Sequence, residues 1–202
     1  KCKKVLFAGK IDKPKISKMR LDLKGIYYIP RIIKAAKLGD AAILKELIKI
    51  LHENKIKVIK SNFFNPELTL SKGNYTRLKV NRLNLENIKI GLNDLNKMNS
   101  YNHVQGLVVR NKKIIIRENE KGTKKMLLLV KKQKKHSGIL IKFPKKRQDK
   151  RADLPTIGLE TLKDCSKAGI NGIVLKSNQN IFLDKKKSIS YANKKKIFIK
   201  II

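Results

Sequence analysis

Two carboxylates, those of Asp149 and Asp153, stand in the most cationic tract of the chain, shortly before a predicted helix that begins at Leu159. The cations around them are Lys142, Lys145, Lys146, Arg147, Lys150 and Arg151. A carboxylate ahead of a helix can hold a divalent metal or orient a water molecule, while neighbouring cations bind phosphate oxygens. Clusters of Asp, Pro and Gly are also ordinary turn chemistry. The tract therefore predicts either a phosphate-binding site or a solvated turn.

A second group of candidate residues lies around Gly122. Glu118 and Thr123 flank this glycine, and a helix is expected over residues 124–132. The backbone N–H groups of a helix N-terminus attract anions, so this group can bind a phosphate. The simpler role for Thr123 is that of an N-cap whose hydroxyl accepts a backbone hydrogen bond, and we favour that role.

Alternating helices and strands position both groups, which indicates an α/β architecture. Apolar periodicity predicts helices over residues 31–38, 40–54, 85–99, 124–132 and 159–168, and a helix or turn over 185–193. Asp40 is expected to cap the second helix, and Gly169 to end the fifth. Strands are predicted over residues 5–8, 56–60, 104–110, 113–117, 139–143, 173–175, 181–183 and 197–202. Asn111 and Lys112 suit the turn of a hairpin, and the weak periodicity of residues 62–81 indicates an inter-domain linker.

The composition is that of a folded and strongly basic protein. Of the 202 residues 41% are hydrophobic, which supports a buried core. No apolar run approaches the roughly 18 residues of a membrane-spanning helix. Fifty Lys and Arg against 15 Asp and Glu give a net charge of +35, which favours nucleic acid, anionic lipid or phosphorylated ligands. The lysines are spread along the chain and aromatic residues are few, which weakens the nucleic-acid interpretation.

The cysteines indicate the cellular compartment of the protein, and the first residues indicate whether the sequence is complete. Cys2 and Cys165 are far apart and form no CxxC motif, which fits reduced thiols in the cytoplasm. Lys1 is followed almost at once by a predicted strand, which is typical of neither a signal peptide nor a natural start. We therefore expect a fragment without its N-terminal part.

Several short motifs follow one another in a specific order. The most specific is Gln-Asp-Lys-Arg-Ala-Asp-Leu-Pro-Thr-Ile-Gly over residues 148–158. The others are Phe7-Ala8-Gly9 before Pro14, Ala35-Ala36-Lys37-Leu38-Gly39-Asp40, Leu68-Thr69-Leu70 before Gly73, Gln105-Gly106, Glu118, Gly122-Thr123, Ala168-Gly169-Ile170 and Gly172-Ile173-Val174. Read together, they resemble the LpxI-type UDP-2,3-diacylglucosamine pyrophosphatase family over essentially the full chain. The family's first strand–helix segment, with its glycine-rich loop, has no counterpart here.

The resemblance implies a fold and a reaction. It implies a partial Rossmann-like N-terminal domain over residues 1–72, a linker over 73–84 and a C-terminal catalytic α/β domain with a mixed sheet over 85–202. In the implied reaction, water attacks the diphosphate of UDP-2,3-diacylglucosamine with Mg²⁺ or another divalent cation. The products are UMP and 2,3-diacylglucosamine 1-phosphate (lipid X), a step of lipid A biosynthesis for the lipopolysaccharide of Gram-negative bacteria.

The resemblance also implies roles for particular residues. Asp153 matches the acidic residue on which hydrolysis depends, and it is the catalytic and metal-binding candidate, with Glu118 as a second metal ligand. The candidates for contacts with substrate or phosphate are Gln105, Gly122, Thr123, Lys142, Lys145, Gln148 and Arg151. Arginine offers a planar fork for phosphate oxygens and lysine a point charge. For most lysines of so basic a chain, solvated surface charge is the simpler interpretation.

The implied partner is a lipid-linked UDP-sugar bound in the cytoplasm, with peripheral contact to the inner membrane and with no nucleic acid; a homo-oligomer is compatible with this. The family usually carries Asp after Gly-Thr and often an acid before the Gly, whereas this chain has Lys124 and Lys121. A degenerate family member that binds the lipid nucleotide without cleaving it is therefore one alternative. A non-catalytic, basic nucleic-acid-binding protein is the other.

Overall fold

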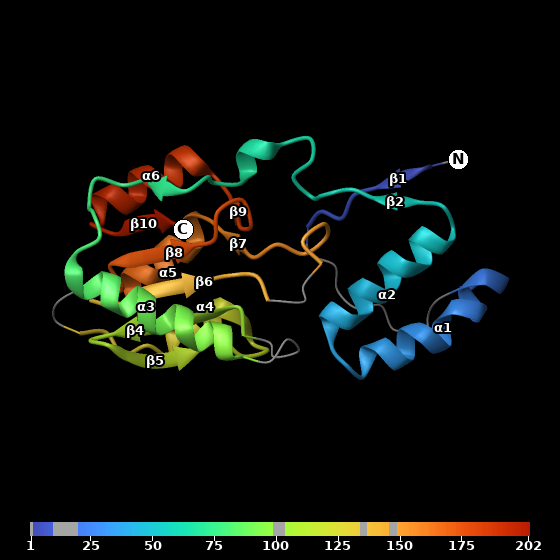
Figure 1. The fold of residues 1–202 in the computed structure, drawn as a ribbon, viewed down its shortest axis with the longest axis horizontal. Helices are drawn as coiled ribbons and strands as arrows, with labels where there is room; N and C mark the ends of the chain where they lie inside the picture. Colours follow the sequence, from blue (N-terminus) through green and yellow to red (C-terminus); the bar gives the residue numbers. More distant parts are fainter. Residues whose placement is uncertain (1, 10–19, 99–103, 134–136, 146–148) are drawn as a thin grey trace. The chain divides into compact units, whose positions relative to one another are not determined.

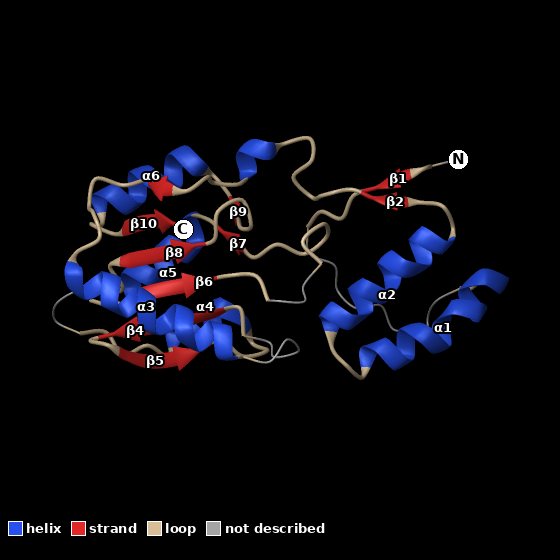
Figure 2. Cartoon of the chain, in the orientation of Figure 1, coloured by secondary structure: helices blue, strands red, loops and turns tan. Residues whose placement is uncertain are grey.

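The structure is a computed structural model that describes residues 2–9, 20–98, 104–133, 137–145 and 149–202. The chain forms two compact units. The first consists of Lys1–Phe64 and Arg147–Asp153, and the second of Asn65–Lys146 and Leu154–Ile202. Both units contain helices and strands (Figure 2), so the expected α/β class with two domains is confirmed.

The first unit combines a short parallel strand pair with two helices. β1 (Lys4–Val5) pairs with β2 (Lys57–Val58), and between them in sequence come α1 (Leu23–Ala36) and α2 (Asp40–Glu53). The Arg31 guanidinium of α1 joins the two helices through the carboxylates of Glu46 and Glu53, each at 2.7 Å. Both helices differ at their starts from the prediction. α1 begins well before residue 31 because the Asp22 side chain caps it, accepting from the Gly25 N–H at 2.7 Å, and Pro30 lies inside the helix. In α2, Gly39 is the N-cap and Asp40 the first helical residue.

The second unit is built on a six-stranded mixed sheet in the order β3-β10-β8-β6-β4-β5 (Figure 1). Its strands are β3 (Gly73–Asn74), β4 (Gly106–Arg110), β5 (Lys113–Arg117), β6 (Ile139–Lys142), β8 (Gly172–Leu175) and β10 (Phe198–Ile201). β6, β8 and β10 run parallel, and β3 and β4 pair antiparallel with the edges of this trio. β4 and β5 form the predicted hairpin, in which Asn111 and Lys112 both take positive φ, at 49° and 63°.

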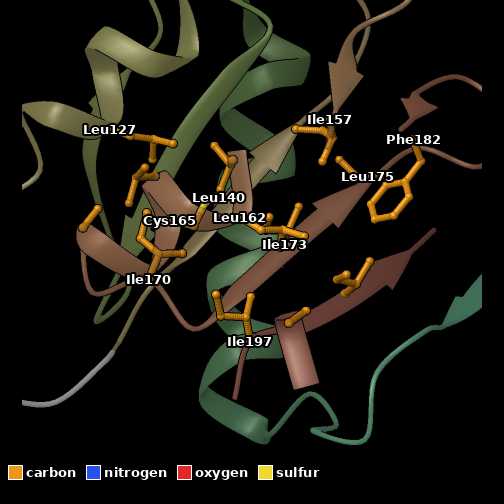
Figure 3. Close-up of a cluster of buried hydrophobic side chains, with 14 of the residues drawn as sticks. Leu127, Leu140, Ile157, Leu162, Cys165, Ile170, Ile173, Leu175, Phe182 and Ile197 are labelled. Carbon is orange, nitrogen blue, oxygen red and sulfur yellow. The ribbon is translucent and has the colours of Figure 1, made fainter. Parts of the chain in front are cut away.

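Helices cover both faces of this sheet. On one face, α3 (Arg82–Lys97) packs through Ile88 on alternate residues of the strands, such as Leu107 and Val109. On the other face lies the larger core (Figure 3), to which α4 (Gly122–Leu128), α5 (Leu159–Lys167) and α6 (Lys185–Lys194) contribute. Its fully buried residues include Leu127, Leu140, Ile157, Leu162, Cys165, Ile170, Ile173, Leu175, Phe182 and Ile197. A two-stranded parallel pair, β7 (Thr156–Ile157) with β9 (Ile181–Phe182), adds to this core.

The stretch assigned to a linker from the sequence, residues 73–84, lies in the second unit. Gly73–Asn74 form β3, the Tyr75 N–H donates to the Ile199 carbonyl at 3.0 Å, and the Arg77 N–H donates to Asn193 Oδ1 at 2.8 Å. A 3₁₀ turn over Pro66–Leu68 comes just before it. Backbone groups bound to the sheet edge in this way explain why a segment of weak periodicity is nevertheless ordered. Within the described ranges, no helix has both the length and the apolar character to cross a membrane.

Candidate functional site

In the second unit, several candidate residues lie at the end of the sheet where the parallel strands β6 and β8 terminate, which we call its carboxyl edge. Lys142 ends β6, where it lies in register with Gly106 at the start of β4 and with Leu175 at the end of β8. Glu118 directly follows β5, and its backbone N–H donates to the Gly106 carbonyl at 2.8 Å. The carboxyl ends of parallel strands are where open α/β sheets hold their ligands. This edge is therefore the first place to look for a site.

A cluster of three side chains, those of the buried Lys142 and Glu118 and of the half-buried Thr123, occupies the edge. Lys142 Nζ lies 3.3 Å from Glu118 Oε1, and only 8% and 6% of the two side chains are exposed. The Thr123 hydroxyl donates to the same carboxylate oxygen at 2.8 Å, and the Lys142 ammonium also donates to Thr123 Oγ1. A buried ion pair is tolerated only where further hydrogen bonds satisfy both charges. Thr123 provides one such bond to each partner.

The predicted N-cap role of Thr123 is wrong. The residue that caps α4 is Lys121, which makes no side-chain cap bond, and Thr123 is the second residue of the helix. Its hydroxyl faces Glu118 instead of a backbone N–H. Gly122, the first residue of α4, takes a φ of +78°, a left-handed conformation that a glycine adopts without strain.

Glu118 has one satisfied and one unsatisfied oxygen. Oε1 accepts from Lys142 and Thr123, whereas Oε2 is buried and has no hydrogen-bond partner among the described residues. Oε2 packs against the backbone of Gly106, where an added Cβ would lie 2.9 Å away from it. Gly106 is therefore required for the close approach of this carboxylate to the strand.

The backbone on either side of Lys142 is also fixed. The buried Asn180 side chain donates to the Lys142 carbonyl at 3.0 Å and accepts from the Lys176 N–H at 3.0 Å. The Phe143 N–H donates to the carbonyl of Gln105 at 2.8 Å, so Gln105 reaches this edge through its backbone. Sequence reasoning missed Asn180. The available signal was an asparagine in the polar turn after β8, at the same strand edge as the candidate cations.

The carboxylates of the opening motif belong to the first unit, as part of Arg147–Asp153. The Arg151 guanidinium forms a fork on Asp149, at 3.0 Å from Nε and 2.7 Å from Nη2, and the Arg151 N–H donates to Asp149 Oδ1 at 3.0 Å. These bonds hold the pKa of Asp149 below its usual range and raise the pKa of Arg151. The Ser61 N–H, which follows β2, donates to the Arg151 carbonyl at 2.8 Å. The segment is thereby tied to the carboxyl end of the β1–β2 pair.

Asp153 ends this segment. Its N–H donates to the Asp149 carbonyl at 3.0 Å, and its side chain is half-buried. No hydrogen bond or ion pair joins its carboxylate to another residue of the described part of the chain. Of the remaining candidates, Lys145 is half-buried in the second unit, and Gln148 lies outside the described residues. The structure thus gathers Gln105, Glu118, Gly122, Thr123 and Lys142 in the second unit, and Arg151 with Asp153 in the first.

The two metal-ligand candidates differ in their fitness for a cation. In the described ranges, no group of three or more His, Cys, Asp or Glu residues is placed to hold a metal. Mg²⁺, however, needs only one or two carboxylates, because it keeps several waters and binds substrate phosphates. Asp153 fits that requirement. Glu118 does not, because one of its oxygens is shared by an ammonium and a hydroxyl and the other is buried against Gly106.

Comparisons with known proteins agree with this division of the chain. The family model described as the LpxI N-terminal domain matches residues 1–68, and the one described as the LpxI C-terminal domain matches residues 71–200. UDP-2,3-diacylglucosamine pyrophosphatase LpxI of Caulobacter vibrioides is 27% identical over 206 aligned residues, which cover 98% of this chain and 74% of that protein. The two family models together span nearly the whole chain, and the chain belongs to the LpxI family.

Proposed function

We propose that this protein is a diphosphatase that hydrolyses UDP-2,3-diacylglucosamine to UMP and 2,3-diacylglucosamine 1-phosphate. Membership of the LpxI family supports a hydrolase-type function related to lipid A biosynthesis. The name of the Caulobacter relative gives the substrate that we propose for this chain. The observation that carries the proposal is the Lys142 ammonium, held among oxygen ligands at the carboxyl edge of the sheet, in a chain of this family.

The chemistry of diphosphate cleavage explains why these residue types are needed. Water forms a new P–O bond while the bond from phosphorus to the bridging oxygen breaks, and negative charge grows on the non-bridging and leaving oxygens. Fixed cations placed before the reaction stabilise that charge. Lys142, with Lys145 and Arg151 as further contacts, supplies positive charge from this chain. Mg²⁺ at Asp153 would add charge neutralisation at the phosphates when bound.

Asp153 has one further task in this proposal. Its carboxylate makes no hydrogen bond or ion pair with another described residue, so it is able to accept a hydrogen bond from the attacking water and orient it. The neighbouring Asp149 is less suited, because its fork with Arg151 occupies both of its oxygens. Lys121 and Lys124 lie in α4 or beside its start, and they add positive charge where family members usually carry acids.

The proposal is tested by measuring UMP release from UDP-2,3-diacylglucosamine in the presence of Mg²⁺. We expect turnover by the wild-type chain and none by Asp153→Ala. Asp164→Ala is the matched control, because Asp164 is a half-buried carboxylate on α5 that we assign no role. Unchanged turnover in Asp153→Ala would remove Asp153 from the mechanism. A wild-type chain that binds the lipid nucleotide without releasing UMP would instead be a degenerate family member.

A cytoplasmic location with peripheral contact to an anionic membrane belongs to the same proposal. The net charge of +35 attracts anionic lipid, and a diacylated substrate resides in a membrane. Co-sedimentation with vesicles that contain phosphatidylglycerol, compared with neutral phosphatidylcholine vesicles, tests the contact. Binding to both kinds of vesicle alike, or to neither, would contradict a contact based on charge.

A further inference from the structure

We propose that Glu118 and Thr123 are positioning residues, which hold the Lys142 ammonium for a phosphate oxygen, and that Glu118 is no ligand of a metal ion. This inference rests on the proposed diphosphatase function and assigns the anion-binding element of that site. It gives the three side chains of this cluster one common task at the carboxyl ends of the strands.

The first reason is the number of hydrogen bonds that the ammonium makes. A lysine ammonium has three N–H donors and no acceptor. In the described part of the chain, Lys142 Nζ donates to Glu118 Oε1 and to Thr123 Oγ1, which accounts for two of its three donors. The two oxygens restrict the rotation of the ammonium. A phosphate oxygen that accepts the third N–H therefore meets a donor whose direction is already set.

The second reason is the state of the two carboxylate oxygens. Mg²⁺ requires oxygen ligands in near-octahedral geometry and keeps several of its waters. Glu118 Oε1 is shared by an ammonium and a hydroxyl, and a cation there would meet the positive charge of Lys142 at short range. Glu118 Oε2 has almost no surface and packs on Gly106. One oxygen therefore already has two donors, and the other is shut off from the solvent that a hydrated metal would need.

The third reason is that burying the Lys142–Glu118 ion pair has a desolvation cost, which a role in ligand binding would explain. Replacing a buried ion pair by apolar residues of similar volume is often neutral or stabilising, so stability alone does not explain this one. Its place at the carboxyl end of β6 is where α/β sheets bind ligands. Asn180 fixes the Lys142 carbonyl as well, so both the backbone and the ammonium of this residue are held.

The test measures binding of inorganic pyrophosphate to the full chain by calorimetry, with and without Mg²⁺. Loss of a hydrogen bond to a charged group weakens binding about tenfold or more. We expect Lys142→Met to show that loss without Mg²⁺, Lys142→Arg to recover part of the affinity, and Thr123→Val and Glu118→Gln each to weaken binding about threefold. The Mg²⁺ concentration for half-maximal UMP release should be the same in Glu118→Gln as in the wild type.

Two sets of variants keep the test independent of folding. Glu118→Gln with Lys142→Met in one chain removes both buried charges, and it should fold and yet bind pyrophosphate as poorly as Lys142→Met. The matched controls are Lys112→Met and Glu86→Gln, because this pair, at 2.7 Å, has the same chemistry but is exposed, and Lys112 lies in the hairpin turn at the other end of β4. Both controls should bind pyrophosphate like the wild type.

The results that overturn the inference are distinct from failure of the proposed function. Wild-type affinity in a folded Lys142→Met chain would show that the cluster is structural only. A higher Mg²⁺ requirement in Glu118→Gln, with Mg²⁺-free pyrophosphate binding unchanged, would make Glu118 a metal ligand. If the wild type binds pyrophosphate through Lys142 but releases no UMP, the inference is supported and the diphosphatase proposal fails.

Discussion

Two acid–base pairs, one in each unit, are built in opposite ways. In the second unit, Lys142 and Glu118 come from residues 24 positions apart and are buried under the sheet edge. In the first unit, Arg151 and Asp149 are two residues apart, and 47% of the arginine side chain is exposed. The geometry of the Lys142–Glu118 pair depends on the whole sheet, whereas that of the Arg151–Asp149 pair depends on one turn. A substitution in the buried pair should therefore lower the stability of its whole unit. A substitution in the exposed pair should have only a local effect.

The largest effect is expected from Glu118→Ala. Removing one partner leaves the Lys142 ammonium buried without its counter-charge, which typically costs about 3–5 kcal/mol. Urea denaturation followed by circular dichroism measures the loss. The double replacement Glu118→Gln with Lys142→Met should retain most of the wild-type stability. A single Glu118→Ala variant as stable as the double variant would contradict the charge-burial argument.

Gly106→Ala should have the next largest effect. The added Cβ would meet Glu118 Oε2 at 2.9 Å and the Ile141 carbonyl at 3.3 Å, so the carboxylate must shift away from the strand. Overpacking of this kind costs about 1–3 kcal/mol in unfolding free energy. If the cluster holds Lys142 for a ligand, pyrophosphate affinity should fall as well. Unchanged stability and affinity would mean that the edge adapts freely.

Arg151→Ala should have a smaller effect, and one that depends on pH. Arg151 depresses the pKa of Asp149, so its stabilisation is present above the ordinary Asp value of about 3.9 and is lost as the pH falls through the depressed pKa. An exposed pair contributes about 0.2–1 kcal/mol. Urea denaturation of the wild type and of Arg151→Ala at pH 7 and at pH 2 should show the two curves converging in acid. A constant difference would exclude Asp149 as the cause.

The smallest effect is expected from Lys112→Met. Lys112 and Glu86 form an exposed pair at 2.7 Å, for which about 0.5 kcal/mol or less is typical. Stability measured at low and at high salt should differ little from that of the wild type. A loss as large as that in Glu118→Ala would remove the distinction between the buried and the exposed pair.

Local signals predicted much of the second unit. The hairpin at Asn111 and Lys112 and the helix stop at Gly169, where φ is +70°, follow from short-range backbone preferences, and both are present. The start of α1 was placed too late, at residue 31, whereas the helix begins at Leu23 because the Asp22 side chain caps it. Weak periodicity over residues 62–81 indicated a linker, because an edge strand of two residues, such as β3, carries almost no periodic signal.

The site was harder to predict than the fold. The sequence analysis placed Glu118 and Thr123 in one group and Lys142 in another. Their shared cluster depends on strand register, which no local pattern specifies. Thr123 was assigned a cap because capping is the commonest role of threonine at a helix start. The role of Asn180 depends on a contact with a strand 38 residues away. The catalytic, metal-binding and phosphate-binding roles predicted from the sequence stay predictions, those of Lys142 and Arg151 as well as those of Asp153, Lys145 and Gln148.

The seven residues 147–153 complete the first unit although both their sequence neighbours belong to the second. The polypeptide therefore passes from one unit to the other three times, after Phe64, after Lys146 and after Asp153. No single cut can release either unit intact: a chain that starts at Asn65 would keep residues 147–153 but lose Ser61, whose N–H donates to the Arg151 carbonyl. The two units therefore cannot be produced intact as two fragments of the chain. A cut after Phe64 would separate Asp153, the catalytic candidate, from most of the first unit.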